Sequence, residues 1–261
     1  MMKLMEYIQD CENLKLIRND SKTINLLGIY KSQNILIKME TKNGDINKIE
    51  NLTEIMDNDR FKKYIGKVFV DCEVIIIYPA LKEDLTPILK DTLVRNVETY
   101  EDYKKNIIPI INKQDLSWMY NIIDGKTEQE KVLFHNDNFI FLPDYKWDQK
   151  NMKNLHCLAI VKNRDIRSLR DLTYKHIYLL ENVYKNGIET VKKIYGLNEN
   201  QLNIYVHYHP SFWHLHIHFS NIEYKNPTIM NHSHSIKTII NNMKIIPNYY
   251  QLIELEVYNH Q

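Results

Sequence analysis

Three histidines alternate with apolar residues in the sequence His214-Leu215-His216-Ile217-His218-Phe219. On a β-strand, successive side chains point to opposite faces, so an extended backbone sends the three histidines to one side and the apolar residues to the other. The apolar side can enter a core, and we expect the strand to cover residues 213–221. The histidines are also concentrated here, because seven of the eleven in the chain lie between His207 and His234.

Three interpretations of the histidine face follow from the pattern. The first is a polar strand face near solvent. The second is a zinc or iron site completed by His207 or Glu223, since alternating histidines on strands can chelate a metal. The third is nucleophilic catalysis at phosphorus, in which a neutral imidazole attacks and neighbouring rings stabilise the phosphoryl oxygens. Periodicity alone leaves the second and third open.

The surrounding sequence predicts further strands and two helices. We expect strands at residues 131–134, 139–142, 156–162 and 201–208. A short helix over 116–124 is closed by Gly125. The clearest helix runs from about Tyr174 to Tyr195, with Thr173 as its N-cap and Gly196 at its end.

The N-terminal part is predicted to be rich in strands. Residues 22–48 indicate strands with a hairpin turn at Asn43-Gly44, and residues 67–79 form a second β-rich stretch. Thr86-Pro87 is typical of a helix start, and irregular helical spacing continues to Ile108. The expected fold is therefore α+β: a β-rich domain over 1–88, a helical linker over 89–114, and a domain over 115–261 with an antiparallel sheet and one long helix.

Composition sets further bounds on function. The chain has 44% hydrophobic and 26% charged residues, which is ordinary for a globular protein, and its net charge of +1 argues against a general nucleic-acid coat. The three cysteines, Cys11, Cys72 and Cys157, form no CxxC pair and predict neither a disulfide framework nor a zinc ribbon. The first ten residues do not resemble a signal peptide, and no apolar run is long enough to cross a bilayer.

Four blocks of sequence, in order, carry a family resemblance. They are Leu116–Ile123, Leu142–Trp147, Arg164–Thr173, and Tyr205–Trp213 followed by the histidine stretch. The alternating histidines match the histidine-triad pattern, and the flanking blocks resemble the scavenger mRNA-decapping enzymes in particular. The resemblance covers residues 86–250 well and the earlier part of the chain loosely.

That resemblance implies a reaction and a role for each histidine. These enzymes hydrolyse the 5′ cap on cap dinucleotides or short capped RNA remnants and release 7-methylguanosine monophosphate. His216 would be the nucleophile that forms a phosphohistidine. His214 and His218 would shape the phosphoryl site, and His207 is similar to a further family histidine on the adjacent strand. No metal or other cofactor is expected.

The same resemblance implies partners and a location. We expect a methylated cap nucleotide as the ligand, and a homodimer with exchanged N-terminal segments. Neither a membrane nor DNA is an expected partner. The expected location is the cytoplasm, with the nucleus as a second compartment.

The resemblance also implies a set of cap-binding residues. Trp118 would stack on the methylated base, whose positive charge favours aromatic faces and carboxylates. Glu128 would bond the guanine edge. The segment Pro143-Asp144-Tyr145-Lys146 would line the other side of the base, with Asp144 on the nucleoside and Lys146 on phosphate. By residue type alone, these positions also suit a core aromatic, a loop carboxylate and a surface strand end.

The chain departs from the family pattern at several positions. Tyr145 replaces an aliphatic residue, which suggests an aromatic sandwich with Trp118. Phe212 stands where a tyrosine commonly helps at the phosphates, and His209 is a candidate local substitute. The family's basic phosphate contact has no clear arginine here, so His232 or His234 is the candidate. Arg167 and Arg170 are interpreted as structural residues beside the capped helix.

Three rival functions remain at this point. A general histidine-triad hydrolase of dinucleoside polyphosphates would not need the methylguanine-binding residues. A cap-binding protein that has lost catalysis is argued against by the intact triad, although Phe212 keeps it open. A metal-dependent enzyme using the same histidines predicts loss of activity with a chelator.

Overall fold

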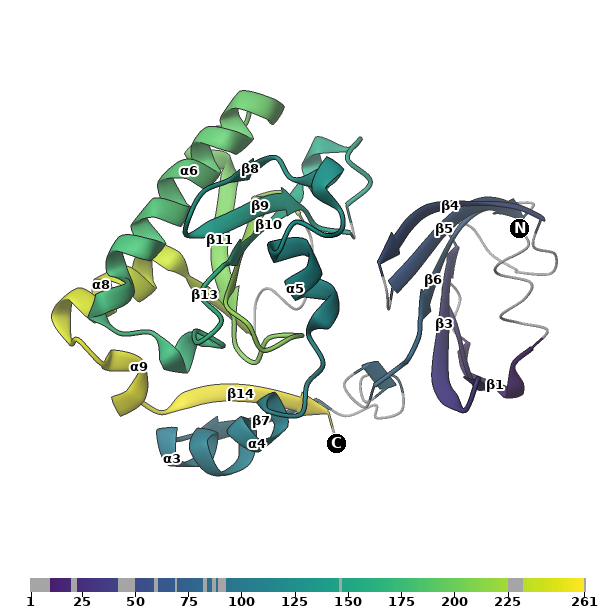
Figure 1. The fold of residues 1–261 in the computed structure, drawn as a ribbon, viewed down its shortest axis with the longest axis horizontal. Coiled ribbons are helices and arrows are strands. Elements are labelled where there is room, and N and C mark those ends of the chain that lie inside the picture. Colours follow the sequence, from purple (N-terminus) through teal and green to yellow (C-terminus); the bar gives the residue numbers. More distant parts are fainter. Residues whose placement is uncertain are drawn as a thin grey trace. The chain divides into compact units, whose positions relative to one another are not determined.

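The computed structural model describes residues 10–19, 23–41, 50–58, 61–68, 70–81, 84–85, 88, 93–145, 147–224 and 232–260. These residues form two compact units that divide after Leu93, and the second unit runs from Val94 to Asn259. Each unit is described separately, and Figure 1 identifies their elements. The mixed α and β content confirms the expected fold class.

The first unit contains a six-stranded antiparallel sheet in the order β1-β2-β3-β6-β5-β4 (Figure 1). Its strands are β1 (Glu12–Asn19), β2 (Thr23–Tyr30), β3 (Gln33–Thr41), β4 (Glu50–Asn58), β5 (Phe61–Val68) and β6 (Val70–Ile77). On β3, Ile35 and Ile37 pack in one apolar cluster and Leu36 in another, as alternation predicts. The sheet is consistent with the expected β-rich N-terminal part.

Turns in this unit were harder to predict. The β2–β3 hairpin turns at Lys31-Ser32, where both residues have positive φ angles (45° and 64°). Neither residue is a glycine, so the turn has no strong sequence signal. The predicted turn at Asn43-Gly44 and the predicted helix start at Thr86-Pro87 lie outside the described residues.

The helical interpretation of residues 89–114 is wrong in its first part. Leu93–Glu98 forms strand β7, which pairs with β14 (Leu255–His260) in a two-stranded sheet. Local spacing cannot reveal a partner strand so far away in the sequence. Helical structure begins only after the Thr99–Asp102 capping box, with α3 (Tyr100–Asp102), a π-helical segment (Tyr103–Ile107) and α4 (Ile108–Ile111).

The second unit is built on a six-stranded antiparallel sheet in the order β13-β11-β12-β10-β9-β8. Its strands are β8 (Phe134–His135), β9 (Phe139–Pro143), β10 (His156–Val161), β11 (Leu202–His207), β12 (His216–Asn221) and β13 (Ser233–Ser235). Four of the five predicted strands are present. The strand predicted at 131–134 is wrong, because Gln129–Lys131 forms a 3₁₀ turn and β8 has only two residues.

Helix α6 (Ile177–Tyr195) covers one face of this sheet and confirms the prediction of a long helix. Thr173 and His176 form a capping box at its 3₁₀ entry, and Gly196 ends it with a φ of 73°. Gly187 allows close packing, since a Cβ there would lie 2.3 Å from Cζ of Phe219. Helices α8 (Ile236–Ile245) and α9 (Tyr249–Leu252) add to the same core, as Met243 and Tyr250 show.

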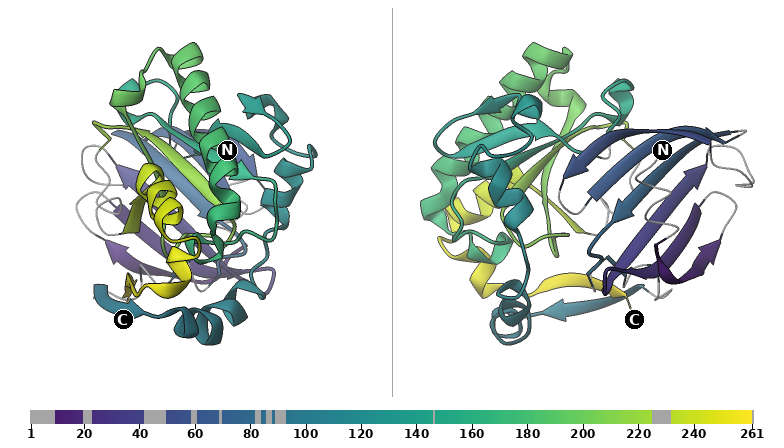
Figure 2. Two further views of the ribbon diagram at one scale, coloured as in Figure 1. Left: turned by 90° about the vertical axis from the view of Figure 1, so that its left-hand side faces the viewer. Right: turned by 45° about the vertical axis from the view of Figure 1, so that its right-hand side comes forward.

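Helix α5 (Ser117–Ile123) covers the other face, as Figures 1 and 2 show. Its Met119 and Ile122 pack in a cluster with residues from β9 and β10: Ile140, Leu142, Leu158 and Ile160. The centre of the sheet is therefore buried on both sides, and the polar residues of its central strands β10 and β12 are enclosed. None of the helices among the described residues is long and apolar enough to span a membrane.

Candidate functional site

Strand β12 places the histidines as alternation predicts. His216 and His218 lie on the α5 side, while Leu215, Ile217 and Phe219 enter the core beneath α6. The strand begins at His216 rather than Trp213, because residues 211–214 bend before it. The histidines are 0%, 2% and 6% exposed, so the face is buried rather than solvated. The interpretation as a polar strand face near solvent is wrong.

His216 is held in one tautomer by the backbone. Its Nδ1 lies 2.7 Å from the carbonyl oxygen of His214. A carbonyl oxygen only accepts hydrogen bonds, so Nδ1 carries the proton and Nε2 keeps its lone pair. Nε2 is buried and has no hydrogen-bond partner among the described residues. Burial also lowers the pKa of His216 to about 4, so the ring is neutral at pH 7. This state is that of a nitrogen nucleophile.

His214 is fixed just before the strand. Its Nε2 donates to the carbonyl oxygen of Val161, and burial lowers the pKa of the ring. The ring stands edge-on to Tyr120 of α5, with centroids 5.8 Å apart. The guanidinium of Arg164 lies over the Tyr120 ring, with its Cζ 4.4 Å from the ring centroid. His214 therefore orients His216 through its carbonyl and contributes a buried ring to the site.

His218 sits among other rings on the same face. Its centroid is 4.9 Å from that of His216 and 4.5 Å from that of His207. Tyr205 of β11 stacks on it with an interplanar angle of 6°. His207 Nδ1 lies 3.3 Å from Oγ of Ser233. The structure thus brings His207 to the triad, as expected for the adjacent strand, and places its ring against His218.

His156 and Asp144 complete this cluster. His156 Nε2 lies 2.9 Å from His218 Nδ1, and its Nδ1 lies 3.9 Å from a carboxylate oxygen of Asp144. His156 was missed as a site residue because it starts a different strand, where no alternation marks it. Asp144, His156 and His218 are also a set that could hold a metal ion, since their donor atoms lie within 4.8 Å of one another.

Two aromatic residues meet at His216. The ring of Phe212 stacks on His216, with centroids 4.0 Å apart and an interplanar angle of 16°. Trp118 of α5 stands edge-on to Phe212 at 5.3 Å. Trp118, which was predicted to stack on the base, therefore contacts Phe212, which was predicted to lie at the phosphates and stacks on His216. Phe212 has no hydroxyl, but it presents an aromatic face to the His216 ring.

The remaining cap-binding candidates lie at the ends of neighbouring elements. Glu128 has a left-handed backbone (φ 54°), and its Oε2 accepts from Lys131 at 3.2 Å. Its Oε1 is buried without a hydrogen-bond partner among the described residues. Such an acceptor suits an N–H donor on a ligand. Pro143 ends β9, Asp144 is buried and Tyr145 is half-buried, whereas Lys146 lies outside the described residues.

The candidate substitutes for missing phosphate contacts are not supported. His209 Nε2 lies 2.7 Å from Oε2 of Glu98, so that side chain is engaged away from the triad. His234 pairs with Val206, whose side chain enters the core beneath α6, on the face opposite the histidines. Burial lowers the pKa of His234 to about 4, so it is no cation at pH 7. His232 packs against Tyr258.

Arg170 has the structural role that was predicted from sequence. It is fully buried, and its Nη1 donates to the carbonyl oxygens of Tyr250 and Ile253 at 2.8 Å. Its guanidinium also pairs with Glu98 at 3.3 Å. Arg167 Nη1 donates to Asn112 Oδ1 at 3.3 Å. The buried ion pair between Arg170 and Glu98 connects the 3₁₀ turn Leu169–Asp171 to the end of β7.

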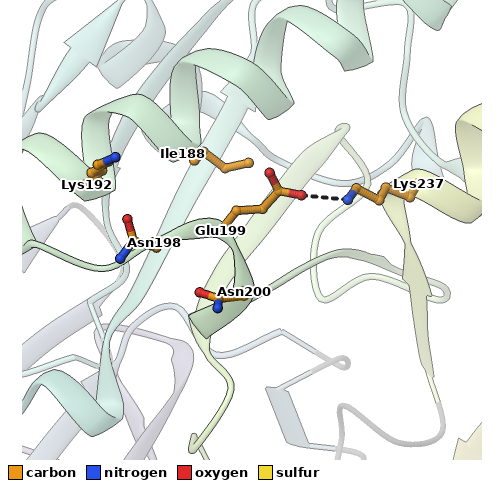
Figure 3. A pocket seen from close by; sticks show the side chains of 6 residues that line it. All are labelled: Ile188, Lys192, Asn198, Glu199, Asn200 and Lys237. Atoms are coloured by element: carbon orange, nitrogen blue, oxygen red, sulfur yellow. Dashed lines mark hydrogen bonds and ion pairs between the residues drawn. The ribbon is translucent and has the colours of Figure 1, made fainter.

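Two hollows in the second unit differ in their relation to the histidines. One lies between α6, the 3₁₀ turn at Glu199–Gln201 and α8, where Glu199 and Lys237 form an ion pair at 2.6 Å (Figure 3). It contains no triad residue. The other is a narrow hollow lined in part by His207, His214 and His216. It is far smaller than a typical ligand pocket of about 300–1,000 Å³ and is too small for a dinucleotide.

A strand with alternating buried histidines, backed by one long helix, defines a histidine-triad protein. The family model described as "Scavenger mRNA decapping enzyme C-term binding" matches residues 117–234. The chain belongs to the scavenger mRNA-decapping enzyme family.

Relatives named m7GpppX diphosphatase support this membership. The protein from Rattus norvegicus is 36% identical over 69% of this chain and 56% of its own length. The one from Ascaris suum is 35% identical over 77% and 70%, and the one from Caenorhabditis elegans is 31% identical over 94% and 86%. The chain thus spans little more than half the length of the mammalian relatives it matches.

Proposed function

We propose that this protein hydrolyses the 5′ 7-methylguanosine triphosphate cap of cap dinucleotides or short capped RNA remnants. The observation that carries the proposal is the state of His216. Its Nδ1 proton is donated to a backbone carbonyl, which leaves a neutral, buried Nε2 lone pair for attack on phosphorus. The relatives named m7GpppX diphosphatase supply the substrate class.

In this proposal His216 Nε2 attacks the phosphate next to 7-methylguanosine. The bond to the bridging oxygen breaks, and its electron pair leaves with the diphosphate-ended nucleotide. Water then cleaves the phosphohistidine and releases 7-methylguanosine monophosphate. His214 and His218 stabilise the phosphoryl oxygens. Trp118 and Phe212 supply aromatic surface beside His216, where a cationic methylated base would be favoured.

The test uses methylated and unmethylated cap dinucleotides with a chelator present, and compares wild type with His216→Asn. The proposal predicts release of 7-methylguanosine monophosphate from the methylated cap by wild type only. Equal turnover of both dinucleotides would favour the general dinucleoside polyphosphate hydrolase. Binding without turnover would favour a cap-binding protein. Activity abolished by the chelator would favour metal catalysis at Asp144, His156 and His218.

A further inference from the structure

The three residues from Phe212 to His214 supply two contacts that hold the His216 ring. The Phe212 ring stacks on it with centroids 4.0 Å apart, and the carbonyl oxygen of His214 accepts from His216 Nδ1 at 2.7 Å. These residues precede β12 and bend, since the N–H of His214 donates to the carbonyl oxygen of Phe212 at 3.0 Å. A bent segment outside the sheet has no neighbouring strand to bind its N–H groups, so other acceptors must hold it.

One side chain holds the middle of this segment. The backbone N–H of Trp213 donates to Oε1 of Gln114 at 2.7 Å, although the two residues are 99 positions apart in the sequence. A backbone N–H only donates, so the atom that faces it must be the amide oxygen of Gln114. Trp213 is 6% exposed. Loss of this acceptor would therefore leave a buried donor unpaired, and the backbone would have to move to satisfy it.

The Trp213 ring fixes the same residue in a second way. It packs against three rings with centroids 5.1 to 6.3 Å from its own, those of Tyr103, Tyr208 and His209. The packed ring fixes the position of Trp213, whereas the hydrogen bond to Gln114 fixes the rotation of its backbone. That rotation determines where the Phe212 ring and the His214 carbonyl oxygen point, and both of them contact His216.

Gln114 also belongs to the segment that carries Trp118. It lies between α4 and α5, and α5 begins shortly after it, at Ser117. Trp118 stands edge-on to Phe212, with centroids 5.3 Å apart. The two aromatic rings that lie beside His216 therefore come from two segments far apart in sequence, and the Gln114 side chain joins those segments.

We propose that Gln114 is a positioning residue whose hydrogen bond to Trp213 keeps His216 in place beside the base-binding rings. Gln114 acts through the backbone on either side of Trp213. The inference rests on the proposed function only for its effect on the reaction. Attack on phosphorus requires a fixed distance between the nucleophile and the held base, and a misplacement of about 1 Å can cost about a hundredfold in rate.

The hydrogen bond can be observed in the unliganded protein by nuclear magnetic resonance. Phe212-Trp213 is the only Phe-Trp pair in the sequence, so carbonyl-¹³C phenylalanine and ¹⁵N tryptophan together label one amide, that of Trp213. In wild type this amide should resonate downfield and exchange slowly. Gln114→Met has a similar size without a strong acceptor, so it should move the signal upfield and speed exchange about tenfold. Gln114→Glu keeps an oxygen there and should retain both properties.

Kinetics on the methylated cap dinucleotide test the effect on the reaction. Gln114→Met should lower kcat about ten- to a hundredfold. Its KM should change less than about twofold, because the residues proposed to bind the base are unchanged. Gln114→Glu should keep kcat within about threefold of wild type, since its oxygen still accepts from Trp213. Lys113→Met is the matched control, because it places the same side chain at the exposed neighbouring position, and it should behave as wild type.

Circular dichroism at the assay temperature shows which variants are folded, and Gln114→Ala replaces Gln114→Met if the latter does not fold. An unchanged Trp213 signal in that variant would disprove the hydrogen bond. Unchanged kcat there, or equally low kcat in folded Gln114→Glu, would overturn the positioning role. A wild type without cap hydrolysis would end the proposed function, while the labelled amide would still decide whether Gln114 holds Trp213.

Discussion

Replacing Gly187 with alanine tests the packing that supports the histidine strand. The new Cβ would lie 2.3 Å from Cζ and 2.5 Å from Cε1 of Phe219, whereas ordinary contacts begin near 3.4 Å. Helix and strand must therefore separate by about 1 Å, or the ring must turn. Turning is restricted, because Phe219 is fully buried and edge-on to Phe141 at 5.0 Å.

Two effects of opposite sign decide the magnitude. Alanine in place of glycine within a helix stabilises by about 1 kcal/mol. Overpacking a well-filled core costs about 1–3 kcal/mol, and the short contact with an aromatic ring places this site at the upper end. We expect Gly187→Ala to lower the free energy of unfolding by about 2 kcal/mol. Because Phe219 lies on the strand of His216, activity on the methylated cap should fall as well.

Urea denaturation followed by circular dichroism measures the first effect, with Lys185→Ala on the exposed face of α6 as the control. The double variant Gly187→Ala/Phe219→Leu makes room for the new methyl group. Its loss of stability should be smaller than the sum of the two single losses by at least about 0.5 kcal/mol. A Gly187→Ala protein as stable as wild type, or more stable, would refute the packing argument.

Further predictions concern the site and its supports. For His216, the depressed pKa of about 4 keeps the ring neutral above pH 5, so the acid limb of kcat/KM should have its midpoint nearer 4 than 6.5; a pH–rate profile checks this. Phe212→Leu should lower kcat about two- to tenfold because the stacked ring is lost, and Phe212→Tyr should keep the wild-type kcat. Steady-state kinetics measure both values, and equal kcat values for the two variants would contradict the prediction. Arg170→Met leaves Glu98 buried with fewer partners and should cost about 3–5 kcal/mol in urea denaturation. Tyr145→Leu should weaken binding of the methylated cap, measured by calorimetry, and an unchanged affinity would end the sandwich hypothesis.

Local patterns predicted much of the second unit. The helix ending at Tyr195 is preceded by the Thr173 capping box and followed by Gly196, and the strand of His216 alternates between a polar and an apolar face. Both signals lie within a few residues, so they can be interpreted without knowledge of the fold. The strand at Leu93–Glu98 has no such signal, because only its pairing with β14 makes it a strand.

The site divides in the same way. The alternation marked the three histidines, and the family resemblance singled out His216 as the nucleophile candidate and Phe212 beside it. His156 was not found, because what marks it is a contact between two strands that are 62 residues apart in sequence. The hypothesis for His209 was unsupported for a related reason, since its partner Glu98 comes from the strand that local spacing failed to predict.

Sequence patterns alone show which residues can share a face and which chemistry those residue types offer. That information is local, because strand alternation and helix capping depend on neighbours in the chain. The protonation of those residues, in contrast, depends on contacts that form only when the chain folds. The tautomer of His216 depends on a carbonyl bent back toward its ring, and its neutrality depends on burial beneath α5. The alternation therefore places the histidines on one face, and the fold around them sets which nitrogen can react.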